Sequence, residues 1–178
     1  MAGAYHEDSN QTSITNGTTA NTDDSLSQSG AAYIFKRTGS TWAQEAYLKA
    51  SNAGSGDIFG ATCDISGNKV IIGAQYEDSN QSTVTNGSTA SSDNSSIDAG
   101  AAYIFSRTGT TWTQIAYLKP PNIDAHDTFS ATVSISGNTV VVGSASEASN
   151  ITSIINGTTA SSDNSVSASG AAYIFKTN

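Results

Sequence analysis

The stretch Gly30-Ala31-Ala32-Tyr33-Ile34-Phe35 returns letter for letter at residues 100–105 and again at residues 170–175. The same spacing of seventy residues relates Thr41-Trp42 to Thr111-Trp112, and no insertion or deletion interrupts it. The chain of 178 residues therefore holds about two and a half copies of one unit. A regular repeat of this length is typical of structural units that stack on their neighbours.

One unit contains four segments with the character of β-strands, at residues 58–65, 69–74, 101–107 and 111–119. The second is a continuous β-branched run, and the third is apolar on both of its faces, so both are expected to be buried between layers. The fourth alternates more loosely and is expected to be an outer edge strand. We therefore predict an all-β fold of tandem four-stranded antiparallel blades of the β-propeller type.

This phase of the repeat divides the chain into three parts. Residues 1–57 are expected to form a partial repeat, with a long polar loop and strands three and four. Residues 58–127 form a complete blade, and residues 128–178 supply strands one to three of another. Because each blade buries its faces only against neighbours, we expect the chain to associate with itself, as an oligomer or filament, or to act within a longer propeller.

Composition excludes several classes of partner. Seven basic residues face fifteen acidic ones without any basic cluster, which argues against nucleic acid and anionic membranes. No apolar run has the length of a membrane span, and the single cysteine, Cys63, excludes an intrachain disulfide. The first residues lack the pattern of a signal peptide, so a leader for export would lie outside this sequence.

Long polar segments at residues 5–29, 75–99 and 145–169 contain ten of the fifteen acidic residues. Their carboxylate and amide oxygens are the ligand types that calcium prefers, so one hypothesis is a calcium site. The alternative is a solvated loop held by Asx and Ser/Thr turns, and Ala148 in place of the third copy's aspartate weakens the metal hypothesis. The candidate metal ligands are Asp8, Asn10, Asp23, Asp24, Asp78, Asn80 and Asp93.

Other side chains suggest further sites. Trp42 and Trp112 could stack on a sugar ring, although their alternation with apolar residues favours a role in covering the blade. Asp57 and Asp127 recur just before the first strand, where they could form a polar ring along the propeller axis, although we expect them to cap a turn. Neither histidine recurs with the repeat, and no nucleophile elbow or phosphate loop is present, so we predict no catalytic residues.

The segment from Asp57-Ile58-Phe59-Gly60 to Val70-Ile71-Ile72-Gly73-Ala74 resembles the FG-GAP repeat of integrin α-subunit β-propellers. The whole unit is similar to bacterial surface or secreted proteins built from such repeats. The resemblance implies a non-enzymatic module for adhesion or scaffolding, extracellular or at the cell surface, with surface proteins or glycans as partners. The family's calcium loop between strands one and two is absent here, because only a short turn joins them.

Two functions from different classes follow from these observations. The first is the adhesion or scaffolding module that the resemblance implies. The second is a carbohydrate-binding, lectin-like propeller that uses Trp42 and Trp112 or the loop Asn and Asp side chains. The fold by itself does not decide between them.

Overall fold

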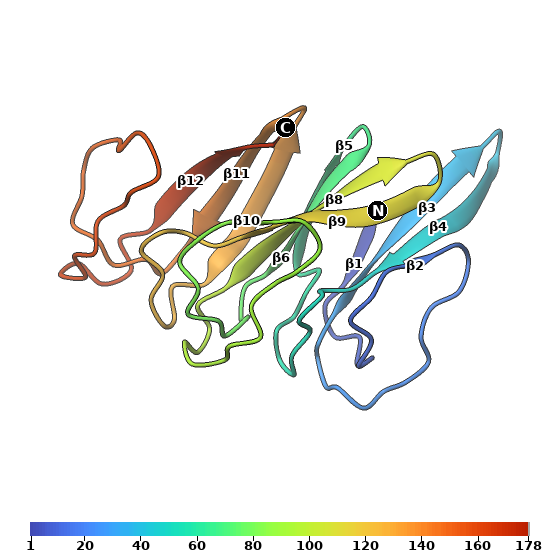
Figure 1. The fold of residues 1–178 in the computed structure, drawn as a ribbon, viewed down its shortest axis with the longest axis horizontal. Helices are drawn as coiled ribbons and strands as arrows, with labels where there is room; N and C mark the ends of the chain where they lie inside the picture. The colour runs from blue at the N-terminus through green and yellow to red at the C-terminus, as the bar shows by residue number, and fades with distance from the viewer. Residues whose placement is uncertain (178) are drawn as a thin grey trace.

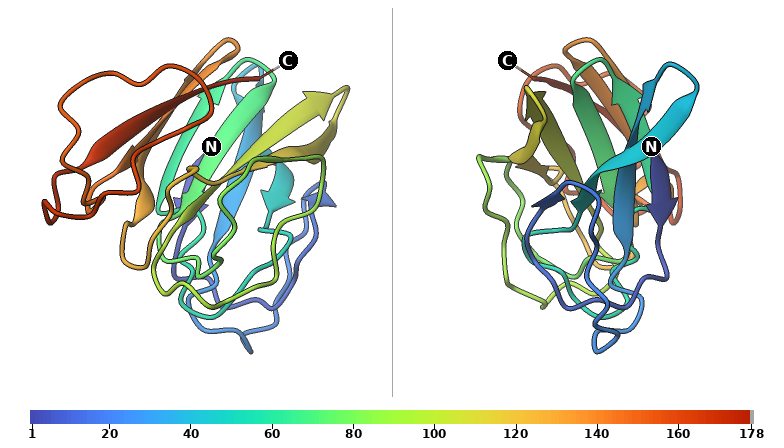
Figure 2. Two further views of the ribbon diagram at one scale, coloured as in Figure 1. Left: turned by 60° about the vertical axis from the view of Figure 1, so that its left-hand side comes forward. Right: turned by 90° about the vertical axis from the view of Figure 1, so that its right-hand side faces the viewer.

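A computed structural model describes residues 1–177 of the chain, and within this range all regular structure is β-strand. The strands form three antiparallel sheets that lie side by side, which we call blades 1, 2 and 3 (Figure 1). The long polar segments of blades 1 and 2, drawn in blue and green, lie at the end of the blades opposite the tight hairpin turns, whereas that of blade 3, drawn in red, extends beside β12 (Figure 2). A search of the described residues for helices suited to crossing a membrane gave none.

Blade 2 is the central sheet and contains five strands in the order β5-β6-β8-β9-β7. Three of its long strands agree with those that the sequence predicts, whereas the first begins at Thr62 and not at residue 58, because Ile58 and Phe59 donate to Gln28 and Ser29 of blade 1 instead. Short turns lie at Gly67 and Gly109. Both glycines have positive φ, which a tight turn of this kind requires. The strands are β5 (Thr62–Ser66), β6 (Lys69–Ala74), β7 (Thr85–Asn86), β8 (Ala101–Thr108) and β9 (Thr111–Leu118).

The prediction that residues 111–119 form an outer edge strand is wrong for one half of that strand. The two-residue strand β7 comes from the long polar segment and pairs Thr85 with Tyr117 and Asn86 with Ala116. This covers the half of β9 that lies nearest the polar loops. A two-residue strand within a polar stretch has no hydrophobic periodicity, so the sequence pattern does not reveal it.

Blades 1 and 3 repeat parts of the same sheet. Blade 1 has the order β1-β3-β4-β2, and blade 3 has the order β10-β11-β12. The register is kept, since Tyr33 pairs with Tyr47 in blade 1 as Tyr103 pairs with Tyr117 in blade 2. The strands are β1 (Ala2–Ala4), β2 (Thr15–Asn16), β3 (Ala31–Thr38), β4 (Thr41–Leu48), β10 (Phe129–Ser136), β11 (Thr139–Ser144) and β12 (Ala171–Lys176).

Two hydrophobic cores hold the blades together, one on each side of blade 2. The alternation of β8 places Tyr103 and Phe105 in the core shared with blade 1. Its neighbours Ala102 and Ile104 lie in the core shared with blade 3. All four side chains are buried, so the predicted burial of this strand on both faces is confirmed.

The outer faces of blades 1 and 3 remain open to solvent. Blade 1 exposes Phe35 and Trp42, whose exposed fractions are 41% and 65%. Blade 3 exposes Val141 and Ile174, at 40% and 70%. We call these the aromatic face of blade 1 and the aliphatic face of blade 3.

Candidate functional site

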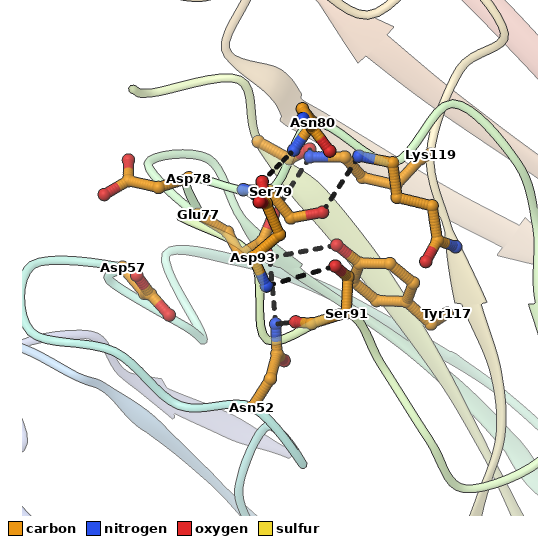
Figure 3. Close-up of polar contacts among 12 residues, drawn as sticks. Asn52, Asp57, Glu77, Asp78, Ser79, Asn80, Ser91, Asp93, Tyr117 and Lys119 are labelled. Carbon is orange, nitrogen blue, oxygen red and sulfur yellow. Dashed lines mark hydrogen bonds and ion pairs between the residues drawn. The ribbon is translucent and has the colours of Figure 1, made fainter. Parts of the chain in front are cut away.

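The most highly connected polar group in the described chain is the carboxylate of Glu77, which follows β6 at the loop end of blade 2 (Figure 3). Its Oε1 atom accepts hydrogen bonds from Asn52 Nδ2 at 2.8 Å and from the Tyr117 hydroxyl at 2.9 Å. Its Oε2 atom accepts from Lys119 Nζ at 2.9 Å and from the Ser79 backbone N–H at 3.2 Å. Since two donors already occupy each oxygen, this carboxylate is arranged to hold the surrounding segments together.

Lys119 follows β9 and forms the cationic half of this cluster. Its side chain is fully buried, and its Nζ atom also donates to the Gly100 carbonyl oxygen at 2.8 Å. Burial disfavours the charged ammonium and lowers the pKa of Lys119, while the neighbouring Glu77 carboxylate opposes that shift. A buried pair of this kind is costly to break, because either charge alone would be left uncompensated.

The cluster also joins successive blades. Asn52, from the segment after β4 of blade 1, donates to Glu77 and accepts a hydrogen bond from the Tyr103 hydroxyl at 2.7 Å. At the next junction, Asn122 makes the same two contacts with Glu147 and Tyr173. We call each set an Asn clasp, and it fixes one blade to the next at the loop end.

Asp57 and Asp127 lie beside these clasps and cap turns, as the sequence predicts. Asp57 accepts a hydrogen bond from the Gly54 backbone N–H at 2.7 Å, and Asp127 accepts one from that of Asp124 at 2.9 Å. Both side chains are buried. Burial raises the pKa of Asp57 to about 7 and that of Asp127 to about 6.

The candidate calcium ligands of the first loop make local hydrogen bonds. Asp23 accepts from the backbone N–H and hydroxyl of Ser25, which lowers the pKa of its carboxyl, and also from the Asn10 backbone N–H. Asp8 accepts from the Gln28 backbone N–H at 2.7 Å, and Asp24 is exposed. These are the contacts of Asx-type turns.

The second loop repeats this arrangement. Asp93 accepts from Ser95 and from the Asn80 backbone N–H, and Asp78 accepts from the Asp98 backbone N–H at 2.9 Å. Over residues 1–177, no three His, Cys, Asp or Glu side chains converge so as to hold a metal ion. Calcium binding by these loops stays a prediction of the sequence, for which a test is given below.

The two tryptophans lie in different surroundings although the sequence treats them alike. Trp112 is buried between blades 1 and 2, where its indole N–H donates to Glu45 at 3.0 Å. Its backbone N–H donates to Asn16 at 2.7 Å. Trp42 stands on the open aromatic face and is mostly exposed. Of the two, only Trp42 presents its ring to solvent.

Reasoning from the sequence missed the clasps. Their signal was present, because Glu7, Glu77 and Glu147 recur at the repeat spacing, as do Lys49 with Lys119 and Asn52 with Asn122. In the sequence these glutamates stand among the other acidic residues of the polar segments, which hides their separate role. A recurring carboxylate and a recurring lysine in one repeat could have indicated a buried pair.

Antiparallel blades that stack face to face and are clasped at one end define a repeat protein of the propeller type. The family model of the FG-GAP repeat matches residues 42–89 and 112–175, more than half of the chain, and the chain belongs to this family. FG-GAP repeats are generally non-enzymatic modules and are typically extracellular. No curated protein matches the chain.

Proposed function

We propose that the chain is a non-enzymatic scaffolding or adhesion module, outside the cell or on its surface, that assembles through the open faces of its end blades. The observation that carries this proposal is the complementary character of those two faces. The aromatic face of blade 1 and the aliphatic face of blade 3 are the two halves of a contact that the chain already buries twice.

The two junctions between blades within the chain show how a contact of this kind is made. Blade 1 turns Ala32 and Ile34 toward the aromatic residues of blade 2. Blade 2 in turn places Ala102 and Ile104 against Tyr173 and Phe175 of blade 3. Each junction therefore joins an aliphatic face to the aromatic face of the following blade.

A second copy can extend this pattern. Its aromatic face carries Tyr33, Phe35 and Trp42, which correspond to the buried Tyr103, Phe105 and Trp112. The aliphatic face of blade 3 carries Ile174, which corresponds to the buried Ile104. The two faces differ, so the contact is head-to-tail and leads to a ring or a filament rather than a twofold dimer.

Sedimentation velocity over a range of concentrations tests the proposal. We expect the wild-type chain to form larger species as concentration rises, and Trp42→Ser and Ile174→Asp each to remain monomeric. A mixture of the two variants should form a one-to-one dimer, because each retains the face that the other has lost. Ile154→Asp, at a 90% exposed loop position on neither face, is the control and should assemble like wild type. A wild-type chain that stays monomeric at every concentration would contradict the proposal.

A carbohydrate-binding function is the second candidate, and the exposed ring of Trp42 favours it. Trp42 is 65% exposed and Phe35, on the same face, is 41% exposed, which suits stacking on a sugar. On this hypothesis, binding to a glycan array is lost with Trp42→Ala and kept with Ile174→Asp. An array without bound glycans, or binding that survives Trp42→Ala, would exclude this role for Trp42.

A further inference from the structure

The seven basic side chains of the chain are divided between two environments. Lys49 and Lys119 are buried at the loop end, where they pair with Glu7 and Glu77. Ten of the fifteen acidic residues also lie in the long polar segments. The remaining basic residues lie in the parts of the strands nearest the tight hairpin turns, and they are Lys36, Arg37, Lys69, Arg107 and Lys176. The hairpin end of the blades is therefore the cationic end of a chain whose net charge is -8.

A groove of about 360 Å³ opens at this end, between blades 1 and 2. Its walls come from residues of β2, β3 and β4 in blade 1 and from Thr110, in the turn between β8 and β9. Sites for small molecules commonly have volumes of about 300 to 1,000 Å³, so the groove has room for a sugar unit. Thr38, Thr41 and Ala43 in its walls are exposed, so it is open to solvent and can also hold one unit of a polymer.

Lys36 is the cationic residue that lines this groove. Within residues 1–177 its ammonium takes part in no hydrogen bond or ion pair. The equivalent residue of blade 2 is Ser106, so the strand does not need a lysine at this position. The ammonium is therefore available to an anionic group of a ligand.

The groove also contains a carboxylate, that of Glu45, but its charge is already balanced. Its Oε2 atom pairs with Arg107 Nη2 at 2.6 Å, and its Oε1 atom accepts from the Trp112 indole N–H at 3.0 Å. The Glu45 side chain is only 9% exposed. Because Arg107 compensates Glu45, the uncompensated charge in the groove is the positive charge of Lys36.

The other walls of the groove offer hydroxyl and apolar groups. Thr38, Thr41 and Thr110 line it, and within the part of the chain that the structure describes their hydroxyls make no hydrogen bonds. Their methyl groups, the side chain of Ala43 and the methylenes of Lys36 supply apolar surface. A sugar has hydroxyl groups at the edge of its ring and C–H groups on its faces, so it matches both kinds of surface.

We propose that this groove binds a carboxylated sugar unit of an acidic polysaccharide. Lys36 donates to the carboxylate of the sugar, and the threonine hydroxyls bond to the hydroxyls of its ring. Trp42 lies between Thr41 and Ala43 in β4, so its ring points to the opposite side of the sheet. Binding in the groove therefore depends neither on the stacking role considered for Trp42 nor on the self-association proposed above.

An NMR titration of the isotope-labelled chain with trigalacturonate tests the site, at a protein concentration where the chain is monomeric. The salt concentration is about 0.15 M, where interactions between exposed charges are largely screened beyond about 8 Å. We expect saturable shifts of the amide signals around the groove. Maltotriose, a neutral trisaccharide, should produce none.

Three variants then locate the binding. Lys36→Ser introduces the residue of the equivalent position in blade 2, and binding should weaken at least about fivefold. Arg37→Thr is the matched control, because it removes the same charge from the same hairpin, yet Arg37 does not line the groove and donates to the Gly39 carbonyl oxygen of its own turn. It should change the affinity less than about twofold. Ala43→Phe fills the groove without a change of charge and should abolish binding.

Melting curves confirm that the three variants fold. The proposal is overturned if trigalacturonate produces no saturable shifts at millimolar concentration, or if Lys36→Ser or Ala43→Phe binds it as well as wild type. Equal losses in Lys36→Ser and Arg37→Thr would also overturn it, as would equal binding of a single-stranded oligonucleotide of the same charge. Either result would show a general attraction of anions to the hairpin end and not a site in the groove.

Discussion

Blade 2 and the end blades share equivalent strands in which many residues are identical, yet several of these identical residues lie in opposite environments. Ile104 of blade 2 is 1% exposed, whereas its equivalent Ile174 of blade 3 is 70% exposed. Trp112 is 2% exposed and Trp42 is 65% exposed. The local sequence sets the strand and its register, but the neighbouring blade sets the burial. Interaction energy in such a molecule belongs to the junctions between repeats.

The largest effect should come from a charge placed on the two equivalent isoleucines. Ile104→Asp buries an unpaired carboxylate between blades 2 and 3, so we expect the free energy of unfolding to fall by more than about 4 kcal/mol. Ile174→Asp meets solvent, so its effect should stay within about 0.5 kcal/mol. Urea unfolding at a concentration where the chain is monomeric measures both. Equal losses of stability would show that the neighbouring blade does not decide burial.

The clasps give a second comparison. The Glu77 side chain is 2% exposed and has four donors, whereas Glu7 is 15% exposed and pairs with Lys49. Glu77→Gln leaves the buried Lys119 ammonium uncompensated, and we expect a loss of about 3–5 kcal/mol. Lys49 is fully buried as well, so Glu7→Gln also leaves an ammonium uncompensated, and we expect a loss at the lower end of that range, about 3 kcal/mol.

A double variant tests whether the loss of stability in Glu77→Gln comes from the uncompensated charge of Lys119. Adding Lys119→Met to Glu77→Gln removes the orphaned charge and should recover part of the lost stability. A double variant less stable than Glu77→Gln alone would mean that Lys119 acts mainly through the Gly100 carbonyl oxygen.

The features that the sequence could predict are the local ones, and those that it could not predict depend on contacts between blades. The four long strands could be predicted because hydrophobic alternation and Gly turns are local signals, as in residues 101–108. The strand β7 could not be predicted in this way. The repeat spacing marks Asn52 and Glu77 as recurring residues, but their contact joins segments far apart in the chain, which local patterns do not reveal. The difference between Trp42 and Trp112 was equally hidden, since their local sequences are nearly identical.

The two aspartates that cap turns, Asp57 and Asp127, extend the comparison to the pH dependence of the free energy of unfolding. A carboxyl whose folded pKa is raised binds its proton more tightly in the native state, so its contribution to stability is present at low pH and is lost as pH rises through the folded pKa. For Asp57 that window runs from about 4 to about 7, and for Asp127 from about 4 to about 6.

Asparagine keeps an acceptor for the turn but cannot ionise. The stability of Asp57→Asn relative to wild type should therefore rise between pH 4 and 7, by at most about 4 kcal/mol. For Asp127→Asn the gain should end near pH 6 and be at most about 3 kcal/mol. Urea unfolding across this pH range tests both. A relative stability that falls as pH rises would show that these carboxyls ionise more readily in the folded protein.

The smallest effect is expected in the polar loops, where the calcium hypothesis is tested. Ligand that binds only the folded state raises the melting temperature, so bound calcium would make the melt sensitive to chelator. Asp23 and Asp93 already accept hydrogen bonds from serines of their own loops. On this ground we expect the same melting temperature with chelator and with added calcium. The matched variants are Asp23→Asn and Asp93→Asn. If calcium raises the wild-type melting temperature and either variant removes the increase, the loops bind the metal through these side chains.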